Sequence, residues 1–508
     1  MRPCRRLQPS PARAPLDSPR MNLERLITAL APTDVVNCAS VEVRDLVYDG
    51  RAVRPGALFF CVPGLQHDGH DFAAAAVAAG AVALVCERPL PLPLPQLLVE
   101  DARQAMAVAA DVFFGGPTRE LRVAGVTGTN GKTTTAYLLA SILDAAGLQA
   151  GLLGTVESRV GGVVRPVVRT TPEAIDLQRA FREMLAAGNR ACAMEASSIA
   201  SALHRLDGTR FAALAFTNLT QDHLDFHGTM EQYFEAKRRL FVGAAPPPAA
   251  VNIDDPWGRR LADELRVRNA APLLTFGLAA DADVRPDSLQ LDGAGARFTA
   301  AGVQVESRLR GRFNVENALG AVGVGLLLGL PAEAIATGIA ALSGVPGRFE
   351  TVDEGQPFTL VVDYAHTPDG LESVLLTARE LVGAGGRVIA VFGAGGDRDR
   401  GKRPEMGRIA SELADIAIVT SDNPRSERPE AIIAEVISGA KAQVEIEIER
   451  RVAITRAVQL GRSGDVVVVA GKGHEQGQEV AGVTHPFDDR VVAAEALRAL
   501  CQPPGAAP

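Results

Sequence analysis

The residues best placed to do chemistry lie in one run at positions 121–139, LRVAGVTGTNGKTTTAYLL. Its glycines would let backbone N–H groups close around an anion, and Lys132 can reach the outer phosphates of a nucleotide. Thr133 or Thr134 can then ligate Mg²⁺. The strict phosphate-loop spacing fails by one residue, because Val126 stands where its first glycine belongs. We expect an ATP-binding turn made of Gly128, Thr129, Asn130, Gly131, Lys132, Thr133 and Thr134.

Oxygen and nitrogen donors follow two further apolar runs. The motif MEASS begins at position 194, and FTNLTQDHLDFHG begins at position 216. If both runs are strands beside the phosphate turn, then Glu195, Asp222 and His223 face that turn. Carboxylate oxygens with one imidazole would suit Mg²⁺ that holds a triphosphate.

Lys237 lies in MEQYFEAKRRLF at helical spacing from Tyr233, Leu240 and Phe241. It therefore belongs to the apolar face of a helix. A buried ammonium needs a partner or a lowered pKa, and a neutral amine can take up CO₂ to form a carbamate that ligates Mg²⁺. From this residue alone we favour the simpler interpretation, a lysine whose ammonium snorkels to solvent.

Polar motifs directly follow four apolar strand candidates, at 358–362, 387–392, 416–420 and 465–470. These motifs are DYAHTPDG, GAGGDRDRGKRP, SDNPR and GKGHE. In an open parallel sheet such segments meet in one crevice at the carboxyl ends of the strands. Cations beside carboxylates would suit a zwitterion such as an amino acid. The charged residues are Arg398, Arg400, Lys402, Arg403, Arg425, Asp397, Asp399, Asp422 and Glu475.

The elements that must position these residues predict an α/β protein. The length of 508 residues suggests roughly three domains, and abundant Ala, Gly and Val with 5% aromatics suit helices packed on parallel sheets. Breaks along the chain divide it into an extension that we expect to be disordered (1–20) and three blocks, 21–115, 116–344 and 345–508. Met21 is an alternative start to Met1.

Composition excludes several classes of function. The net charge of −8 and the absence of a dense Lys/Arg stretch give no reason to expect a nucleic-acid partner. The longest apolar stretch, 72–86, is too short to span a bilayer, so no membrane insertion is expected. The six cysteines form no C-x-x-C pair and suit reduced thiols, which favours a cytoplasmic location.

Taken together, the motifs resemble one family closely. GTNGKTT, MEASS, FTNLTQDHLDFHG, FNVENALGA, GRFE, VDYAHTPDGLE, FGAGGDRDRGKRP, DNPR and GKGHE occur in an order similar to that of the Mur ligases, over about residues 21–500. The resemblance implies a UDP-sugar domain, a central P-loop-type mononucleotide-binding sheet and a C-terminal Rossmann-like domain for an amino acid. It is strongest to the branch that adds the third peptide residue to a peptidoglycan precursor.

The implied activity is a ligation that consumes ATP and needs Mg²⁺. The implied substrates are UDP-N-acetylmuramoyl-L-alanyl-D-glutamate and meso-diaminopimelate, joined through an acyl phosphate by an enzyme expected to be monomeric. By this resemblance Lys132, Glu195, His223 and Lys237 are catalytic, with Lys237 carboxylated. The implied metal contacts are Thr133, Glu195, His223 and the Lys237 carbamate.

The resemblance also assigns the remaining site residues. Later motifs supply nucleotide contacts at Asn314, Arg348 and Asp363. The UDP-sugar dipeptide would meet Tyr48, Gly50, Gln66, His67, Thr170, Thr171, Ser197 and Arg205. Diaminopimelate would meet Arg398, Asp422, Asn423, Pro424, Arg425, Gly471 and Glu475. Arg425 would form bidentate hydrogen bonds with the distal carboxylate of diaminopimelate, which lysine lacks.

Three positions depart from the family pattern. Ile199 replaces a histidine, Leu203 replaces a glutamine, and Gly50 replaces a serine that touches the uridine moiety. Substrate contacts there are expected to be rearranged.

Other functions remain as alternatives. The lysine-adding ligase is the nearest rival, and DNPR discriminates against it. The folate polyglutamate ligases match the motifs more weakly. A P-loop switch or a non-catalytic nucleotide-binding protein would leave the C-terminal crevice and Lys237 unexplained.

Overall fold

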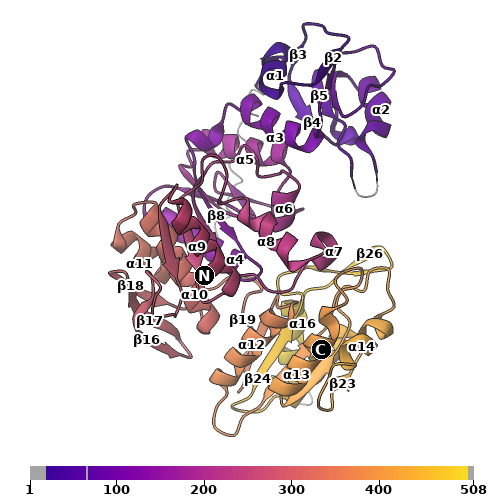
Figure 1. Ribbon diagram of the computed structural model, residues 1–508. Coiled ribbons are helices and arrows are strands. Elements are labelled where there is room, and N and C mark those ends of the chain that lie inside the picture. The colour runs from indigo at the N-terminus through magenta and orange to yellow at the C-terminus, as the bar shows by residue number, and fades with distance from the viewer. Residues whose placement is uncertain (1–18, 65–66, 502–508) are drawn as a thin grey trace, which may run out of the picture. The chain divides into compact units, whose positions relative to one another are not determined.

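The computed structural model describes residues 19–64 and 67–501 (Figure 1). The extension expected at 1–20 lies almost entirely outside the described residues. The chain forms two compact units. The first runs to Glu120 and also contains Glu173–Ala187 and Leu203–Thr209, whereas the rest of the chain forms the second.

The first unit is built on a five-stranded sheet. Its order is β2 (Asp34–Val36), β7 (Gln96–Leu98), β6 (Ala81–Cys86), β5 (Ala57–Phe60) and β4 (Asp45–Val47), with only the β2–β7 pair antiparallel. The same unit contains a separate antiparallel pair of two short strands, β1 (Met21–Asn22) and β3 (Glu42–Val43). All four residues of β5 are buried because apolar side chains cover both faces of the sheet. The helices are α1 (Leu23–Leu30), α2 (Ala73–Ala78), α3 (Ala102–Phe113) and α5 (Ala174–Ala186).

The second unit begins with an eight-stranded sheet. Its order is β11 (Val163–Arg165), β10 (Ser158–Val160), β9 (Ala150–Leu153), β12 (Ala191–Glu195), β8 (Arg122–Thr127), β13 (Phe211–Phe216), β14 (Ala249–Asn252) and β15 (Leu273–Phe276). From β9 to β15 the strands are parallel, and β8 lies between β12 and β13. The carboxyl ends of β8, β12 and β13 therefore lie side by side.

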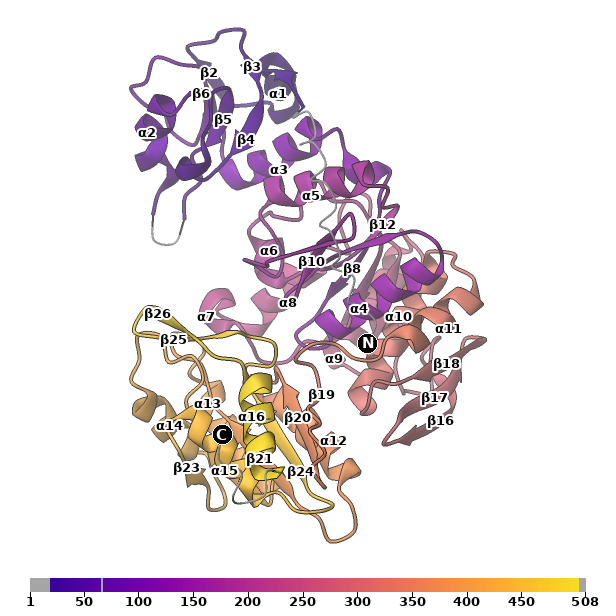
Figure 2. The ribbon, with the colours of Figure 1, turned by 180° about the vertical axis from the view of Figure 1, so that it is seen from behind.

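Helices of this part of the unit pack around one large apolar core. Helix α4 (Lys132–Ala145) packs against α10 (Arg312–Leu327) and α11 (Ala332–Ala341), as Figure 2 shows. An antiparallel sheet of β16 (Pro286–Asp292), β17 (Gly295–Ala300) and β18 (Val303–Ser307) adds to the same core. The other helices are α6 (Ser198–Ala202), α7 (Leu224–His227), α8 (Met230–Arg238) and α9 (Pro256–Arg268).

A six-stranded sheet forms the C-terminal part of the second unit. Its order is β19 (Glu350–Thr351), β20 (Thr359–Asp363), β24 (Val466–Ala470), β21 (Val388–Phe392), β22 (Ile416–Val419) and β23 (Glu445–Ile446), parallel except for β19. Apolar residues bury both faces, as expected when helices connect parallel strands. Its four long strands match the strand candidates of the sequence to within a residue or two.

Helices cover both faces of this C-terminal sheet. Helices α12 (Pro368–Leu381), α13 (Lys402–Leu413) and α14 (Pro429–Ile437) share one core, and α15 (Arg450–Leu460) and α16 (Asp489–Cys501) share the other (Figure 2). A hairpin of β25 (Gly477–Val480) and β26 (Val483–Pro486) lies apart from the sheet. Within the described residues, no helix combines the length and apolarity needed to cross a membrane.

Candidate active site

The glycine-rich turn joins β8 to α4 and closes tightly against the segment that follows β13. Thr217 Oγ1 donates to Asn130 O at 2.6 Å, and Asn218 Oδ1 accepts from Asn130 N at 2.8 Å. A Cβ on Gly128, where φ is +152°, would lie 1.8 Å from Thr217 Oγ1. Gly131, at φ +83°, is the N-cap of α4. The turn therefore requires glycine at both positions, and its helix N-terminus favours an anion.

Two lysines meet at one carbonyl of this turn. Lys132 Nζ donates to Gly128 O at 3.0 Å, and Lys237 Nζ, from α8, donates to the same oxygen at 2.7 Å. Lys237 is 1% exposed and its ammonium lies 4.5 Å from the centre of the Tyr233 ring. Burial first, and the nearby Lys132 charge second, hold the pKa of Lys237 well below its usual range.

The snorkelling interpretation of Lys237 is therefore wrong. Its side chain points inward to the phosphate turn, where the ammonium donates to Gly128 O and lies over the Tyr233 ring. The apolar spacing correctly placed Lys237 on the buried face of the helix. What the spacing did not show is that a backbone carbonyl receives the amine there.

Glu195 ends β12 as a buried carboxylate with several donors. Its Oε1 accepts from Thr133 Oγ1 at 3.0 Å and from Thr155 N at 2.7 Å, and its Oε2 accepts from Thr155 Oγ1 at 3.1 Å. These bonds fix the carboxylate beside the first turn of α4. The structure thus brings Glu195 and the phosphate turn together, as the strand-end argument predicted.

Asp222 and His223 lie after β13, where the sequence predicted them. Asp222 is buried with His223 Nε2 at 3.3 Å from Oδ2, His366 Nε2 at 3.7 Å from Oδ2 and Lys402 Nζ at 3.6 Å from Oδ1. Although burial opposes it, the bond from His366 and the neighbouring cations hold the pKa of Asp222 well below its usual value. Burial lowers the pKa of His223 to about 4, so its imidazole is neutral at pH 7.

The later motifs reach the same place from α10 and the C-terminal sheet. Arg348 Nη2 donates to Thr133 Oγ1 at 3.1 Å, and its guanidinium lies 4.4 Å from the centre of the Tyr364 ring. Asp363 accepts from Phe349 N at 2.6 Å and from Ala365 N at 2.7 Å, so it anchors the turn that presents Arg348. Asn314 donates to Arg310 O at 2.8 Å and accepts from Asn317 at 3.0 Å.

The four C-terminal motifs converge, as predicted, at the carboxyl ends of the parallel strands. Asn423 joins two of them, because its Oδ1 accepts from Lys472 Nζ at 2.9 Å and its Nδ2 donates to Glu475 Oε2 at 2.9 Å. Lys472 itself is fully buried and also donates to Glu475 at 2.8 Å. Gly396 N donates to Asn423 O at 2.9 Å, which brings in the motif after β21.

The predicted cationic character of this crevice is only partly correct. Arg403 is fully buried and pairs with Glu427 at 2.7 Å and Glu435 at 2.8 Å, and Arg400 also pairs with Glu435. Lys402 faces Asp222 instead. Arg400 and Arg403 are neutralised by Glu427 and Glu435, which lie outside the motifs, and Lys402 by Asp222 of the central motif.

Arg425 and Arg398 retain positions suited to a ligand. Arg425 is half-buried in a left-handed conformation, φ +52°, with Nη1 donating to Gly396 O at 2.6 Å and Nε at 3.3 Å from Glu479 Oε2. Arg398 is exposed and donates to Asp397 O at 3.2 Å. Pro424 and Asp422 are buried, and Asp422 lies next to Gly471, where an added Cβ would be 2.5 Å from Asp422 Oδ2.

The predicted UDP-sugar and dipeptide residues occur in both units. In the first, Tyr48 Oη donates to Asp176 Oδ2 at 2.7 Å, and Arg205 pairs with Glu173 at 3.0 Å. Gly50 lies in a short 3₁₀ turn, His67 lies edge-on to Phe72, and Gln66 is outside the described residues. In the second unit, Thr171 donates to Glu195 O at 2.8 Å and accepts from Ser197 N at 3.2 Å, while Thr170 contacts Thr155.

Sequence reasoning missed several residues of this cluster. Thr155 follows β9 and contacts both oxygens of Glu195, and Asp369 accepts from Asn130 Nδ2 at 2.7 Å. Thr155 sits just past an apolar run, the same signal that identified Glu195. His474 lies inside the quoted GKGHE motif but was not assigned a role.

The residues fit a divalent cation in their donor chemistry. In the described part of the chain no group of three His, Cys, Asp or Glu side chains is arranged to hold a metal. The predicted set instead combines a hydroxyl, a carboxylate, a neutral imidazole and a modified lysine. Glu195 is anchored at the phosphate turn, His223 is neutral, and the lowered pKa of Lys237 favours the amine that carbamate formation requires.

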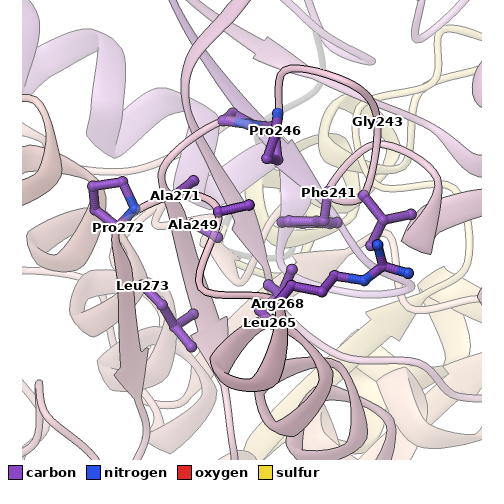
Figure 3. A pocket seen from close by; sticks show the side chains of 12 residues that line it. Phe241, Gly243, Pro246, Ala249, Leu265, Arg268, Ala271, Pro272 and Leu273 are labelled. Atoms are coloured by element: carbon purple, nitrogen blue, oxygen red, sulfur yellow. The ribbon is translucent and has the colours of Figure 1, made fainter.

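A separate pocket lies away from these motifs. It is lined by apolar residues around β14 and α9, including Phe241, Pro246 and Leu265, with Arg268 at its side (Figure 3). None of the predicted site residues lines it. The predicted site residues therefore lie at the ends of the strands and not in this pocket.

Comparison with known proteins identifies the family. The Mur ligase middle domain matches residues 126–325, the Mur ligase glutamate ligase domain matches 347–473, and the catalytic domain of the Mur ligase family matches 42–113. The chain belongs to the Mur ligase family. The fold has the α/β architecture of this family, as the sequence predicted.

Several Mur ligases are similar over nearly the whole chain. A UDP-N-acetylmuramoyl-L-alanyl-D-glutamate–2,6-diaminopimelate ligase of Solibacter usitatus is 47% identical over 94% of this chain and 98% of its own. The ligase of the same name from Geobacter metallireducens is 45% identical over 94% and 99%. A solved structure with that name is 35% identical, with a TM-score of 0.65, over 91% and 96%. MurF of Acinetobacter baumannii shares the fold at 19% identity, with a TM-score of 0.65 over 95% and 99%.

Proposed function

We propose that this Mur ligase joins meso-diaminopimelate to the γ-carboxylate of the D-glutamyl residue in UDP-N-acetylmuramoyl-L-alanyl-D-glutamate, with conversion of ATP to ADP and phosphate. Relatives that carry the name of this activity are 42–47% identical to the chain. The observation that carries the proposal is the bond from Arg348 to Thr133, because it joins the phosphate turn to the part of the unit that bears the amino-acid motifs.

ATP is the substrate that the glycine turn suits. The backbone N–H groups at the start of α4 would hold the phosphates, and Lys132 would turn from the carbonyls of Gly128 and Thr129 toward them. Mg²⁺, held by Thr133, Glu195, His223 and a carbamate on Lys237, would neutralise charge on the phosphates. Asn314, Arg348 and Asp363 would complete the nucleotide site, with Asp363 acting through the Arg348 turn.

The reaction needs two displacements. An oxygen of the γ-carboxylate attacks the γ-phosphorus of ATP, the bond to ADP breaks, and an acyl phosphate forms. The amine of diaminopimelate then attacks the acyl carbon, phosphate leaves, and the nitrogen loses a proton as the amide forms. Lys132 and Arg348 supply positive charge at the phosphate turn, where negative charge develops in both steps.

Lys237 is proposed to be carboxylated. Its Nζ is buried, lies beside a second ammonium, and has a strongly lowered pKa, so the neutral amine is accessible at pH 7. Attack of that amine on CO₂ forms an N–C bond and releases one proton. The resulting anion would remove the repulsion between the two lysines at Gly128 O.

Diaminopimelate is favoured over lysine by Arg425. Its guanidinium is half-buried and follows Asn423 in the chain, and Asn423 together with Glu475 would suit the ammonium and carboxylate of an amino acid. Lysine has no distal carboxylate to accept from this guanidinium, so it forgoes a charged hydrogen bond that diaminopimelate would make there. Arg398, Asp422, Pro424 and Gly471 would line the same site. The lysine-adding ligase is the second candidate.

The dipeptide and uridine contacts remain proposals. Thr170, Thr171, Ser197 and Arg205 would hold the dipeptide, and the first three surround the end of β12 next to Glu195. Tyr48, Gly50, Gln66 and His67 would contact the UDP-sugar. We also propose the domain limits 21–115, 116–344 and 345–508, which rest on the breaks along the sequence.

The setting of the reaction follows from its substrates. ATP and a UDP-linked precursor are cytoplasmic metabolites, so we infer a cytoplasmic enzyme that acts on small molecules as a monomer. Light scattering coupled to gel filtration would test the monomer, and a stable dimer would contradict it.

A phosphate-release assay read together with product mass tests the proposed function. The reaction contains ATP, Mg²⁺, UDP-N-acetylmuramoyl-L-alanyl-D-glutamate and either meso-diaminopimelate or L-lysine. We expect turnover with diaminopimelate only. Turnover with lysine would support the second candidate, and no turnover with either would refute the ligase assignment.

A further inference from the structure

His474 lies where two distant parts of the second unit meet. Its Nδ1 lies 3.4 Å from Arg348 Nη1, its ring is hydrogen-bonded to the Thr155 backbone, and its ring centre lies 5.2 Å from that of Tyr364. A Cβ on Gly347, at φ +66°, would lie 2.1 Å from His474 N. Gly347 therefore permits the GKGHE loop to lie directly against the Arg348 turn.

The two partners of His474 both lead to Glu195. Thr155 donates to the two carboxylate oxygens at 2.7 and 3.1 Å. Arg348 donates to Thr133 Oγ1 at 3.1 Å, which donates to Glu195 Oε1 at 3.0 Å. The contacts close a ring of hydrogen bonds through Glu195, Thr155, His474, Arg348 and Thr133.

The same loop reaches the amino-acid crevice on its other side. Glu475, the next residue, accepts from Asn423 Nδ2 at 2.9 Å and from Lys472 Nζ at 2.8 Å. One short segment thus connects the proposed nucleotide site to the proposed diaminopimelate site. A displacement of His474 would move Glu475 relative to Thr133.

We propose that His474 is a positioning residue that sets the distance between the activated acyl carbon and the attacking amine. The inference rests on the proposed function, because it presumes that the two sites hold the two reacting groups. A positional error of about 1 Å between reacting groups can lower a rate by about a hundredfold. The closed ring restrains the GKGHE loop against such an error.

The bonding of His474 argues against a role as the base that deprotonates the amine. Because Arg348 donates to Nδ1, that nitrogen is occupied as an acceptor and the proton of the neutral ring is on Nε2. The ring is also hydrogen-bonded to the Thr155 backbone. Burial, and then the Arg348 charge, lower the pKa of His474 to about 4, which leaves a weak base.

The experiment compares His474→Phe, His474→Gln and the control His485→Gln with the wild-type enzyme. Phe keeps a ring against Tyr364 but makes neither hydrogen bond, whereas Gln keeps an amide that can still hydrogen-bond to the Thr155 backbone. His485 is exposed on β26 and belongs to none of the proposed sites. Phosphate release and amide formation are measured separately, with KM for each substrate and circular dichroism for folding.

We expect His474→Phe to lower kcat for amide formation by about tenfold to a hundredfold, with KM for ATP changed less than about threefold. Phosphate should exceed amide, because misplaced acyl phosphate hydrolyses. His474→Gln should recover part of the coupling, and His485→Gln should match the wild type.

Three results would overturn the inference. The first is a His474→Phe enzyme with normal kcat that forms one amide for each phosphate released. The second is a defect confined to KM for diaminopimelate, and the third is misfolding of both His474 variants. A wild-type protein that forms no amide would instead refute the proposed function, and this inference with it.

Discussion

The ion pair between Arg450 and Asp489 offers a sharp test of how the amino-acid crevice is held. Both side chains are completely buried, with Nε donating to Oδ1 at 2.7 Å and Nη2 to Oδ2 at 2.6 Å. Arg450 also donates to Ala470 O at 2.9 Å and to Ser421 O at 3.4 Å. These carbonyls precede the GKGHE and DNPR motifs, so the pair ties both loops to the start of α15 and α16.

The perturbation is Asp489→Asn, which keeps the shape but removes the negative charge. Breaking one partner of a buried ion pair costs about 3–5 kcal/mol, because the remaining charge stays in a low-dielectric site. For a domain of about 150–250 residues, each kcal/mol lowers Tm by roughly 2–4 °C. We therefore expect the C-terminal sheet to melt about 6–20 °C earlier.

The chain supplies a matched control on the same two helices. Arg451 Nη1 pairs with Glu495 Oε2 at 2.6 Å, but both side chains are 50% exposed. Such a pair contributes about 0–1 kcal/mol, so Glu495→Gln should change Tm by less than about 4 °C.

The assay is thermal unfolding followed by calorimetry, with hydrogen–deuterium exchange of peptides from β24 and α16 to locate the change. Exchange in the eight-stranded sheet should stay as in the wild type. If Asp489→Asn shifts Tm no more than Glu495→Gln does, burial is not what makes this pair strong, and the reasoning fails.

Three further predictions follow from the site. Arg425→Ala should raise KM for diaminopimelate by at least about tenfold with little change in ATP affinity, as expected when a charged hydrogen bond is lost. Arg425→Lys should not restore the wild-type KM. An unchanged KM in Arg425→Ala would contradict the assignment. In ¹³C-bicarbonate the wild type should show a carbamate NMR signal that Lys237→Met lacks, and a signal of equal size in both would exclude this site. Burial, and then the charge of Asp254, raise the pKa of Glu316 from 4.5 to about 7. The folded protein binds the Glu316 proton more tightly than the unfolded chain does, so protonation of Glu316 stabilises the fold. This contribution to the free energy of unfolding is complete below pH 4.5 and is lost as pH rises through 7. Glu316→Gln should therefore have the Tm of the wild type at pH 5 and a higher Tm at pH 8, whereas parallel curves of Tm against pH would refute the linkage.

Local patterns allowed most of the fold to be predicted. Short apolar runs followed by polar motifs identified β8, β12, β13 and the four long C-terminal strands, because the buried strands of parallel sheets are continuously apolar. The glycines of the phosphate turn were equally readable, since a Cβ at Gly128 would collide with Thr217.

The partners of charged side chains were not readable from the sequence. Arg403 was expected in a cationic crevice, yet Glu427 and Glu435 bury and neutralise it. Lys237 was expected to snorkel, yet its amine bonds to Gly128 O, 109 residues away in sequence. A side chain's charge state depends on groups brought close by folding, and a local motif contains no information about them.

Patterns over short spans were enough to predict the phosphate turn and the strands that precede the motifs, because these depend on backbone conformation and apolar runs. The order of the motifs along the chain indicated the family. Folding brings Thr155 to Glu195 and His474 to Thr155, and no local pattern in the sequence indicates either contact. Hydrogen bonds form over about 3 Å between atoms that hundreds of residues can separate along the chain. The packing of the sheets, and not the spacing of the motifs, sets those distances.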